Sequence, residues 1–142
     1  MTAKEYLEQV YRLDREINTK LEEIEMLRSM TGKVTGSYEG ETVSHSRNVH
    51  SLENIIIQLM EAENSLNGEI SRLVDLKTEV KALLEKVEND SYRQILIKRY
   101  LCYLPWSRIS YEMHYSRRWT LTKHERALEV VQKIMKQEGI QE

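Results

Sequence analysis

Apolar residues recur at helical spacing along the first thirty residues of the chain. They repeat every seven positions and form one narrow face, which predicts a helix over residues 2–30. Thr2 and Glu5 have the spacing of a capping box at its start. The two apolar rows are Ala3, Val10, Ile17, Ile24 and Tyr6, Leu13, Leu27, with Leu7 and Leu21 beside them.

A second and longer apolar pattern predicts a helix over residues 49–88. Its main row is Leu52, Leu59, Leu66, Leu73, Val80 and Val87, with Ile56, Ile70 and Leu84 in a second row and Ile55, Ala62, Leu76 and Leu83 as flanking positions. A row this regular needs a partner, and the nearest is the first helix, folded back antiparallel. Because the second helix is longer, part of its apolar row must be covered by the C-terminal domain or by another copy of the chain. We therefore expect a homodimer.

Residues 31–48 interrupt the helical pattern. Gly32, Gly36 and Gly40 stand there among Ser, Thr and Glu, and neither a helical nor a strand period continues. This composition is typical of a mobile linker. A phosphate-binding loop is the less favoured alternative, since the Gly-Lys-Ser/Thr sequence that such a loop requires does not occur.

Residues 89–142 carry the signals of three shorter helices. Asn89 or Asp90 caps the first, because a short polar side chain accepts a hydrogen bond from a free backbone N–H of the opening turn. Pro105 ends that helix and suits the start of the next, which we expect to run to Met113.

The turn between the second and third of these helices is short. His114 tolerates the positive φ that a tight turn requires, and Ser116 caps the third helix, which we expect to stop near Gly139. Two helices joined by such a turn, the second carrying cations in its first turn, are typical of a helix-turn-helix unit. The sequence thus predicts an all-α fold: a long antiparallel, coiled-coil-like helical hairpin in residues 1–88, followed by a three-helix helix-turn-helix domain in residues 89–142.

Charge is distributed unevenly between these two regions. Residues 1–88 carry a net charge of −6 and residues 89–142 a net charge of +4. Between Arg93 and Arg126 there are eight cations and two anions. A basic face of this kind is the expected footprint of double-stranded DNA, although ordinary helical surface is the alternative explanation.

The third helix supplies the candidate DNA contacts. Arg117 and Arg118 directly follow the cap, where a recognition helix presents side chains to base edges. Arg108 and Arg126, which lie farther away, are candidate phosphate contacts. The complete candidate set is Arg108, Ser116, Arg117, Arg118, Thr120, Leu121, Lys123, His124 and Arg126.

The C-terminal region also resembles region 4 of bacterial sigma factors. More closely still, it is similar to phage-encoded sigma-like regulators of the ArpU/RinA type. The residues that carry the resemblance are Tyr92-Arg93-Gln94-Ile95-Leu96, Arg99-Tyr100, Trp106, Ile109, Tyr115-Ser116-Arg117 and Arg126-Ala127-Leu128. The resemblance implies a transcriptional regulator of phage or prophage origin, with RNA polymerase among its partners.

The sequence departs from this family at the third helix. The family pattern places aliphatic residues at the positions of Thr120 and Lys123, whereas the apolar residues here are Trp119 and Leu121. The rotation of the recognition helix therefore stays open at this stage.

Other classes of function find less support. The four histidines lack the spacing of a metal site, Cys102 is the single cysteine, and no nucleophile motif occurs. We therefore expect no enzyme, metal or cofactor, and no membrane-spanning segment. The aromatic residues of this region are expected in its core, and the single cysteine predicts a cytoplasmic setting. The competing hypothesis is a helical phage assembly or packaging adaptor that binds protein rather than DNA.

Overall fold

In the computed structural model, residues 1–36 and 45–140 are described, and within them the protein is all-helical, without strands. The two long helices are α1 (Ala3–Gly36) and α2 (His45–Glu85). Four shorter elements follow: α3 (Asp90–Leu96), the π-helix η2 (Ile97–Leu101), α4 (Trp106–Met113) and α5 (Arg117–Glu138). None of the helices within the described ranges is long and apolar enough to cross a membrane.

The long helices extend farther into the expected linker than the sequence pattern predicts. α1 continues through residues 31–36, and α2 begins at His45. The glycine at position 32 is helical, and a helix tolerates such a residue at a cost of only about 1 kcal/mol. Residues 37–44, the middle of the expected linker, lie outside the described residues.

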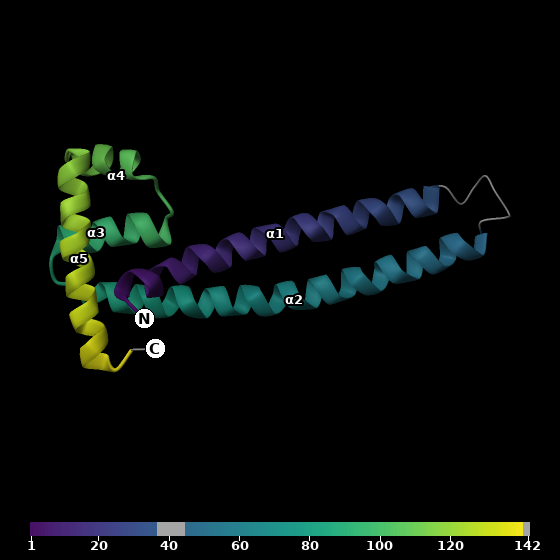
Figure 1. Cartoon of the computed structure of the whole chain (residues 1–142), viewed down its shortest axis with the longest axis horizontal. Helices are drawn as coiled ribbons and strands as arrows, with labels where there is room; N and C mark the ends of the chain where they lie inside the picture. Colours follow the sequence, from purple (N-terminus) through teal and green to yellow (C-terminus); the bar gives the residue numbers. More distant parts are fainter. Residues whose placement is uncertain (37–44, 141–142) are drawn as a thin grey trace. The chain divides into compact units, whose positions relative to one another are not determined.

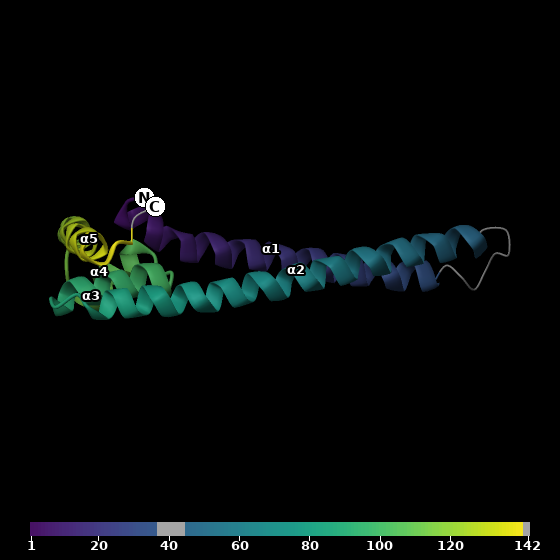
Figure 2. The same ribbon diagram turned by 90° about the horizontal axis from the view of Figure 1, so that it is seen from below.

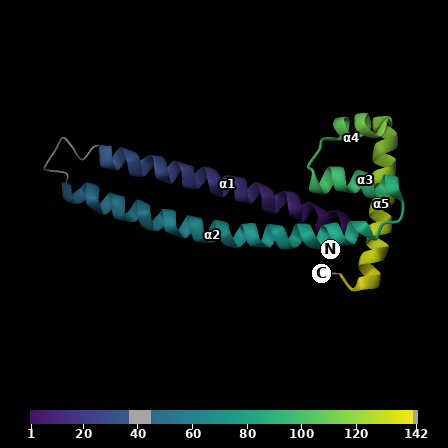
Figure 3. The same ribbon diagram turned by 180° about the vertical axis from the view of Figure 1, so that it is seen from behind.

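The protein divides into two compact units. The first combines residues 1–14 with residues 73–142, and the second is residues 15–72. This division differs from the expected boundary at residue 88, because the ends of both long helices belong with the short helices. Figures 1 and 3 show α5 crossing the first turns of α1 and the last turns of α2.

A single hydrophobic core explains this grouping of the first unit. Leu7 from α1, Leu84 from α2 and Val131 from α5 each have 0% of their surface exposed. The other buried members are Ala3, Tyr6, Val10, Val80, Leu83, Val87, Leu96, Tyr100, Ala127, Leu128 and Met135. Polar contacts accompany the core: the backbone N–H of Ala3 donates to Gln132 Oε1 at 2.7 Å.

The second unit is a pair of helical segments running in opposite directions (Figure 2). Outside residues 33–48, whose side chains are not described, the buried residues of this pair are Ile17, Ile24, Leu27, Ile55, Ala62 and Leu66. Arg28 Nη2 donates to Glu63 Oε1 across the pair at 3.0 Å. One face of α2 differs from the sequence expectation: the flanking positions Ile55 and Ala62 are buried, whereas Ile56 and Ile70 are 41% and 40% exposed.

Candidate nucleic-acid interface

The expected boundaries of the short helices are confirmed by their local geometry. Asn89 caps α3, its side chain accepting from the backbone N–H of Tyr92 at 3.1 Å. Pro105 precedes α4 in an extended conformation. His114 adopts the left-handed conformation at φ 60°, as expected for the turn after α4.

The start of α5 is also fixed by a side-chain cap. Ser116 Oγ accepts from the backbone N–H of Trp119 at 3.1 Å, and α5 ends at Gly139, which is left-handed at φ 71°. A sharp turn of three residues, 114–116, thus connects α4 to α5. Because both ends of the turn are fixed by backbone conformation and capping, the first turn of α5 has a defined position relative to α4.

Thr120 sets the rotation of α5 that the sequence left open. Its side chain is fully buried and its Oγ1 lies 3.0 Å from Ser110 Oγ of α4, which donates to it. Thr120 Oγ1 in turn donates to the carbonyl of Ser116 at 2.9 Å. This polar contact occupies the position where the related pattern has an aliphatic side chain. Thr120 was a candidate DNA contact, but it faces α4 and does not lie on the surface.

His124 is likewise inside the protein, with 3% of its surface exposed. Its Nε2 forms a hydrogen bond with the hydroxyl of Tyr100 at 2.7 Å, and the ring of Trp106 packs edge-on at 4.6 Å between centroids. Burial, together with the charges of Lys4 and Arg99, lowers the pKa of His124 to about 4. A neutral, buried imidazole therefore supports packing, and its position excludes the expected direct contact with DNA in this conformation.

Lys123 is held in a cage of aromatic side chains. Its Nζ lies 4.9 Å from the ring centroid of Tyr115, 5.5 Å from that of Trp119 and 5.8 Å from that of Tyr92. The same Nζ donates to Ser91 Oγ at 2.9 Å. These cation–π contacts and this hydrogen bond direct the ammonium group toward α3 and the aromatic rings, so the half-buried Lys123 joins α3 to α5.

Most of the other cations of the basic region form an ion pair or a cation–π contact within the protein. Lys98 and Arg108 both donate to Glu112, at 2.6 and 2.8 Å, and these two hydrogen bonds hold the pKa of Glu112 below its usual value. Arg99 lies 4.5 Å from the centroid of Trp106, and Arg126 lies 5.3 Å from that of Trp119. Arg93 Nη2 donates to Asp90 at 2.6 Å.

Arg117 and Arg118 are the two remaining cations of the basic region. Both are exposed, and within the described ranges neither forms an ion pair or a cation–π contact. The first turn of α5 contains no acidic residue. Two cations at the positive end of a helix dipole oppose folding by several tenths of a kcal/mol each, so their placement does not serve stability.

Helical spacing identifies surface residues that the sequence analysis missed. Thr122 and Glu125 lie four and seven positions after Arg118, on the same outward face of α5, and the side chain of Glu125 is 73% exposed. On α4, Tyr111 is 82% exposed. The spacing was visible in the sequence, but it could be used only once the buried side of α5 was known. Of the other expected contacts, Arg108, Ser116, Leu121 and Arg126 are exposed.

Among the described residues no cluster of His, Cys, Asp and Glu has the arrangement of a metal site. Comparisons with protein-family models, curated proteins and solved structures give no match, so the resemblance to sigma region 4 rests on the quoted residues alone.

Proposed function

We propose that α4 and α5 form a helix-turn-helix unit that binds double-stranded DNA and that the protein is a sequence-specific transcriptional regulator of the sigma region 4-like type. In this arrangement α5 is the recognition helix and α4 lies across the DNA backbone. The helical pair formed by α1 and α2 would serve assembly or docking on polymerase. The resemblance in sequence and the tight turn at His114 support this proposal, and the assembly adaptor remains its competitor.

The observation that carries the proposal is the pair of free arginines at the start of α5. Their cost to helix stability is relieved when a polyanion approaches the same helix end. The six other cations of this region are already held by Glu112, Asp90 or aromatic rings. A phosphate backbone or a guanine edge would give the two free guanidinium groups the partners that the protein does not supply.

The residues on the outward face of α5 are the ones that would contact DNA. Arg118 is at its centre and would donate two hydrogen bonds to O6 and N7 of guanine, a contact worth about 1–3 kcal/mol of discrimination. Thr122 and Glu125 continue the same face into the groove. Arg108 and Arg126 are exposed at the flanks and would contact phosphates, which changes affinity for all sequences about equally.

The test is a binding titration on duplexes selected from a random pool, compared with unselected duplexes at two salt concentrations. Arg118→Ala should reduce the ratio of specific to non-specific affinity about tenfold or more. Arg126→Ala should weaken both kinds of duplex equally and lower the salt slope by about one. Lys133→Ala is the matched control, because it removes an exposed cation from the same helix more than three turns away.

If wild-type protein shows no salt-dependent binding to any duplex, the regulator hypothesis fails and the adaptor hypothesis replaces it. Equal losses for Arg118→Ala and Lys133→Ala would instead indicate non-specific attraction to a basic surface.

A further inference from the structure

The basic region contains two acidic side chains, and their surroundings differ. Glu112 on α4 accepts hydrogen bonds from Lys98 and Arg108 at 2.6 and 2.8 Å, so cations of the fold neutralise its charge. Among the described residues, the carboxylate of Glu125 on α5 pairs only with Nδ1 of His124, at 3.8 Å, and burial keeps that imidazole neutral. The side chain of Glu125 is 73% exposed. It therefore brings an uncompensated negative charge to the surface of α5.

The helix around Glu125 does not compensate this charge. Side chains three and four positions apart are neighbours on a helix, and here those positions are Leu121, Thr122, Leu128 and Glu129. None of the four is a cation, and Glu129 is a like charge that weakly destabilises the helix. Like the pair of free arginines at the start of α5, Glu125 is not placed for the stability of that helix.

Glu125 shares the outward face of α5 with Arg118. The two residues are seven positions apart, so they point to nearly the same side of the helix and lie about 10.5 Å apart along its axis. This length corresponds to about three base pairs of DNA, at about 3.4 Å each. Both side chains can therefore contact one short stretch of bases when α5 lies in the major groove.

We propose that Glu125 is a specificity-determining residue of the recognition helix and that its carboxylate accepts a hydrogen bond from the N4 amino group of a cytosine. This inference rests on the proposed DNA-binding function. A carboxylate in the groove is repelled by the phosphates on both sides, so it lowers affinity unless a base edge supplies a donor. In the major groove only cytosine and adenine carry amino groups, and adenine places the acceptor N7 beside its amino group. Cytosine is therefore the base that best fits a carboxylate.

The test is a selection of duplexes from a random pool by the full-length protein, repeated with single variants. Wild type should select a cytosine about three base pairs from the guanine whose selection Arg118→Ala abolishes. With Glu125→Gln the preference at that position should change from cytosine to adenine, because a glutamine amide pairs with N6 and N7 of adenine. In titrations the variant should lose about tenfold in discrimination for cytosine. It should also bind unselected duplexes more tightly than wild type, because one negative charge is removed.

Glu129→Gln is the matched control. It makes the same change of charge at an exposed position about one turn farther along α5, away from the end that enters the groove. Its base preferences should equal those of wild type, with any gain in affinity the same for all duplexes. Both side chains are at the surface, so both variants should fold, as circular dichroism can verify.

Two results would overturn the assignment of Glu125 while leaving DNA binding intact. One is a Glu125→Gln variant that, like Glu129→Gln, changes affinity equally for every duplex, since Glu125 would then be a surface charge alone. The other is a base other than cytosine at the position that Glu125→Gln affects. A wild-type protein that binds no duplex has a different meaning, because it removes the proposed function and this inference with it.

Discussion

The two units of this protein bury their side chains to different depths. In the first unit, side chains from six segments are enclosed on all sides, and Leu7, Leu84 and Val131 are fully buried. Among the side chains of the second unit that the structure describes, the most buried is Leu27 with 3% exposed, and several large apolar side chains lie at the surface. Two helices can cover only one side of each other, whereas a crossing helix such as α5 closes the remaining sides.

The contrast extends to polar groups. The first unit contains buried hydrogen bonds, between Ser110 and Thr120 and between Tyr100 and His124. The second has an exposed ion pair, Arg28 with Glu63. A polar contact in a dry interior is costly to break, while one in water is easily replaced. Substitutions in the first unit should therefore have larger effects than equivalent ones in the second.

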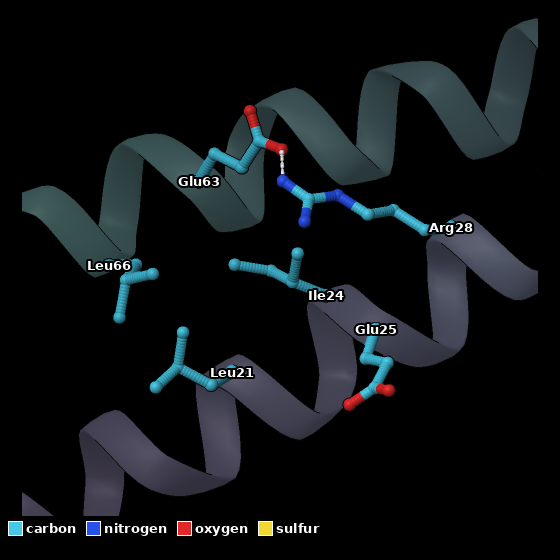
Figure 4. Close-up of a pocket in the computed structure, with 6 residues that line it drawn as sticks. All are labelled: Leu21, Ile24, Glu25, Arg28, Glu63 and Leu66. Atoms are coloured by element: carbon cyan, nitrogen blue, oxygen red, sulfur yellow. Dashed lines mark hydrogen bonds and ion pairs between the residues drawn. The ribbon is translucent and has the colours of Figure 1, made fainter.

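Truncation of a core leucine gives the largest expected difference. Leu84→Ala should lower the free energy of unfolding by about 3–5 kcal/mol, because it leaves a cavity in an enclosed core. Leu66→Ala should cost about 2 kcal/mol, because Leu66 lies at a shallow hollow that Leu21 and Ile24 also line (Figure 4), where water and neighbouring side chains can occupy the space. Urea denaturation followed by circular dichroism measures both. Equal losses would mean that the two units have equally enclosed cores.

Acidification should affect the first unit through His124. Its pKa is lowered to about 4, below the value near 6.5 of the unfolded chain, so the unfolded state binds more protons between these pH values. Stability from the neutral imidazole is complete above pH 6.5 and is lost as pH falls toward 4, by about 3 kcal/mol. His124→Gln should flatten this part of the pH profile. If its profile follows wild type, the imidazole does not cause the loss.

The Ser110–Thr120 hydrogen bond can be tested by a double-mutant cycle. Thr120→Val should cost about 1–2 kcal/mol, because it leaves the buried hydroxyl of Ser110 without its acceptor. Adding Ser110→Ala should restore most of that loss, since an apolar pair of similar shape has no polar group to satisfy. Thermal melts of the two single variants and the double variant give the coupling. Additive losses would show that the two hydroxyls do not depend on each other.

Lys123 should contribute to the stability of the fold and not to the electrostatic attraction between the protein and DNA. Lys123→Met removes the ammonium from its aromatic cage and should cost about 1 kcal/mol. If the protein binds DNA, the salt slope of this variant should match that of wild type, unlike that of Arg126→Ala. A slope reduced by one would place Lys123 on the DNA and contradict its inward position.

The smallest effect is expected at the ion pair of the second unit. Arg28→Ala removes a contact in which both side chains are largely exposed, and it should change monomer stability by less than about 1 kcal/mol. Urea denaturation at low and high salt provides the measurement. A loss as large as that of Thr120→Val would mean that solvent does not screen this pair.

Local signals in the sequence predicted the boundaries of the short helices. The caps at Asn89 and Ser116, the left-handed His114 and the end at Gly139 depend on the residue itself and its nearest neighbours. The π-helix at Ile97–Leu101 was not predicted. Here it forms the last turn of the helix that begins with α3, and the wider spacing of one terminal turn is too short to show in a pattern of apolar positions.

The candidate site was predictable only in part, because the side of α5 that faces inward is decided by distant residues. Thr120 can be buried because its hydroxyl accepts a hydrogen bond from Ser110. His124 can be buried because its ring forms a hydrogen bond with the hydroxyl of Tyr100. From sequence alone, a polar residue is assigned to the surface unless the residue that forms a hydrogen bond with it is known. The same limit applies to Ile56, which looked like core although α1 covers the neighbouring face of α2.

The left-handed residue at Tyr103 has a consequence for the chain between η2 and α4. Its φ is 58°, a conformation that costs an aromatic residue energy, and its ring packs edge-on against Tyr11 at 5.4 Å between centroids. Lys77 lies 5.1 Å above the same ring. The ring of Tyr103 thus connects the segment before α4 to both long helices. A glycine at this position would relax the backbone but would lose these two contacts. In homologous proteins we expect an aromatic residue at this position rather than glycine, although glycine is the usual residue in a left-handed conformation.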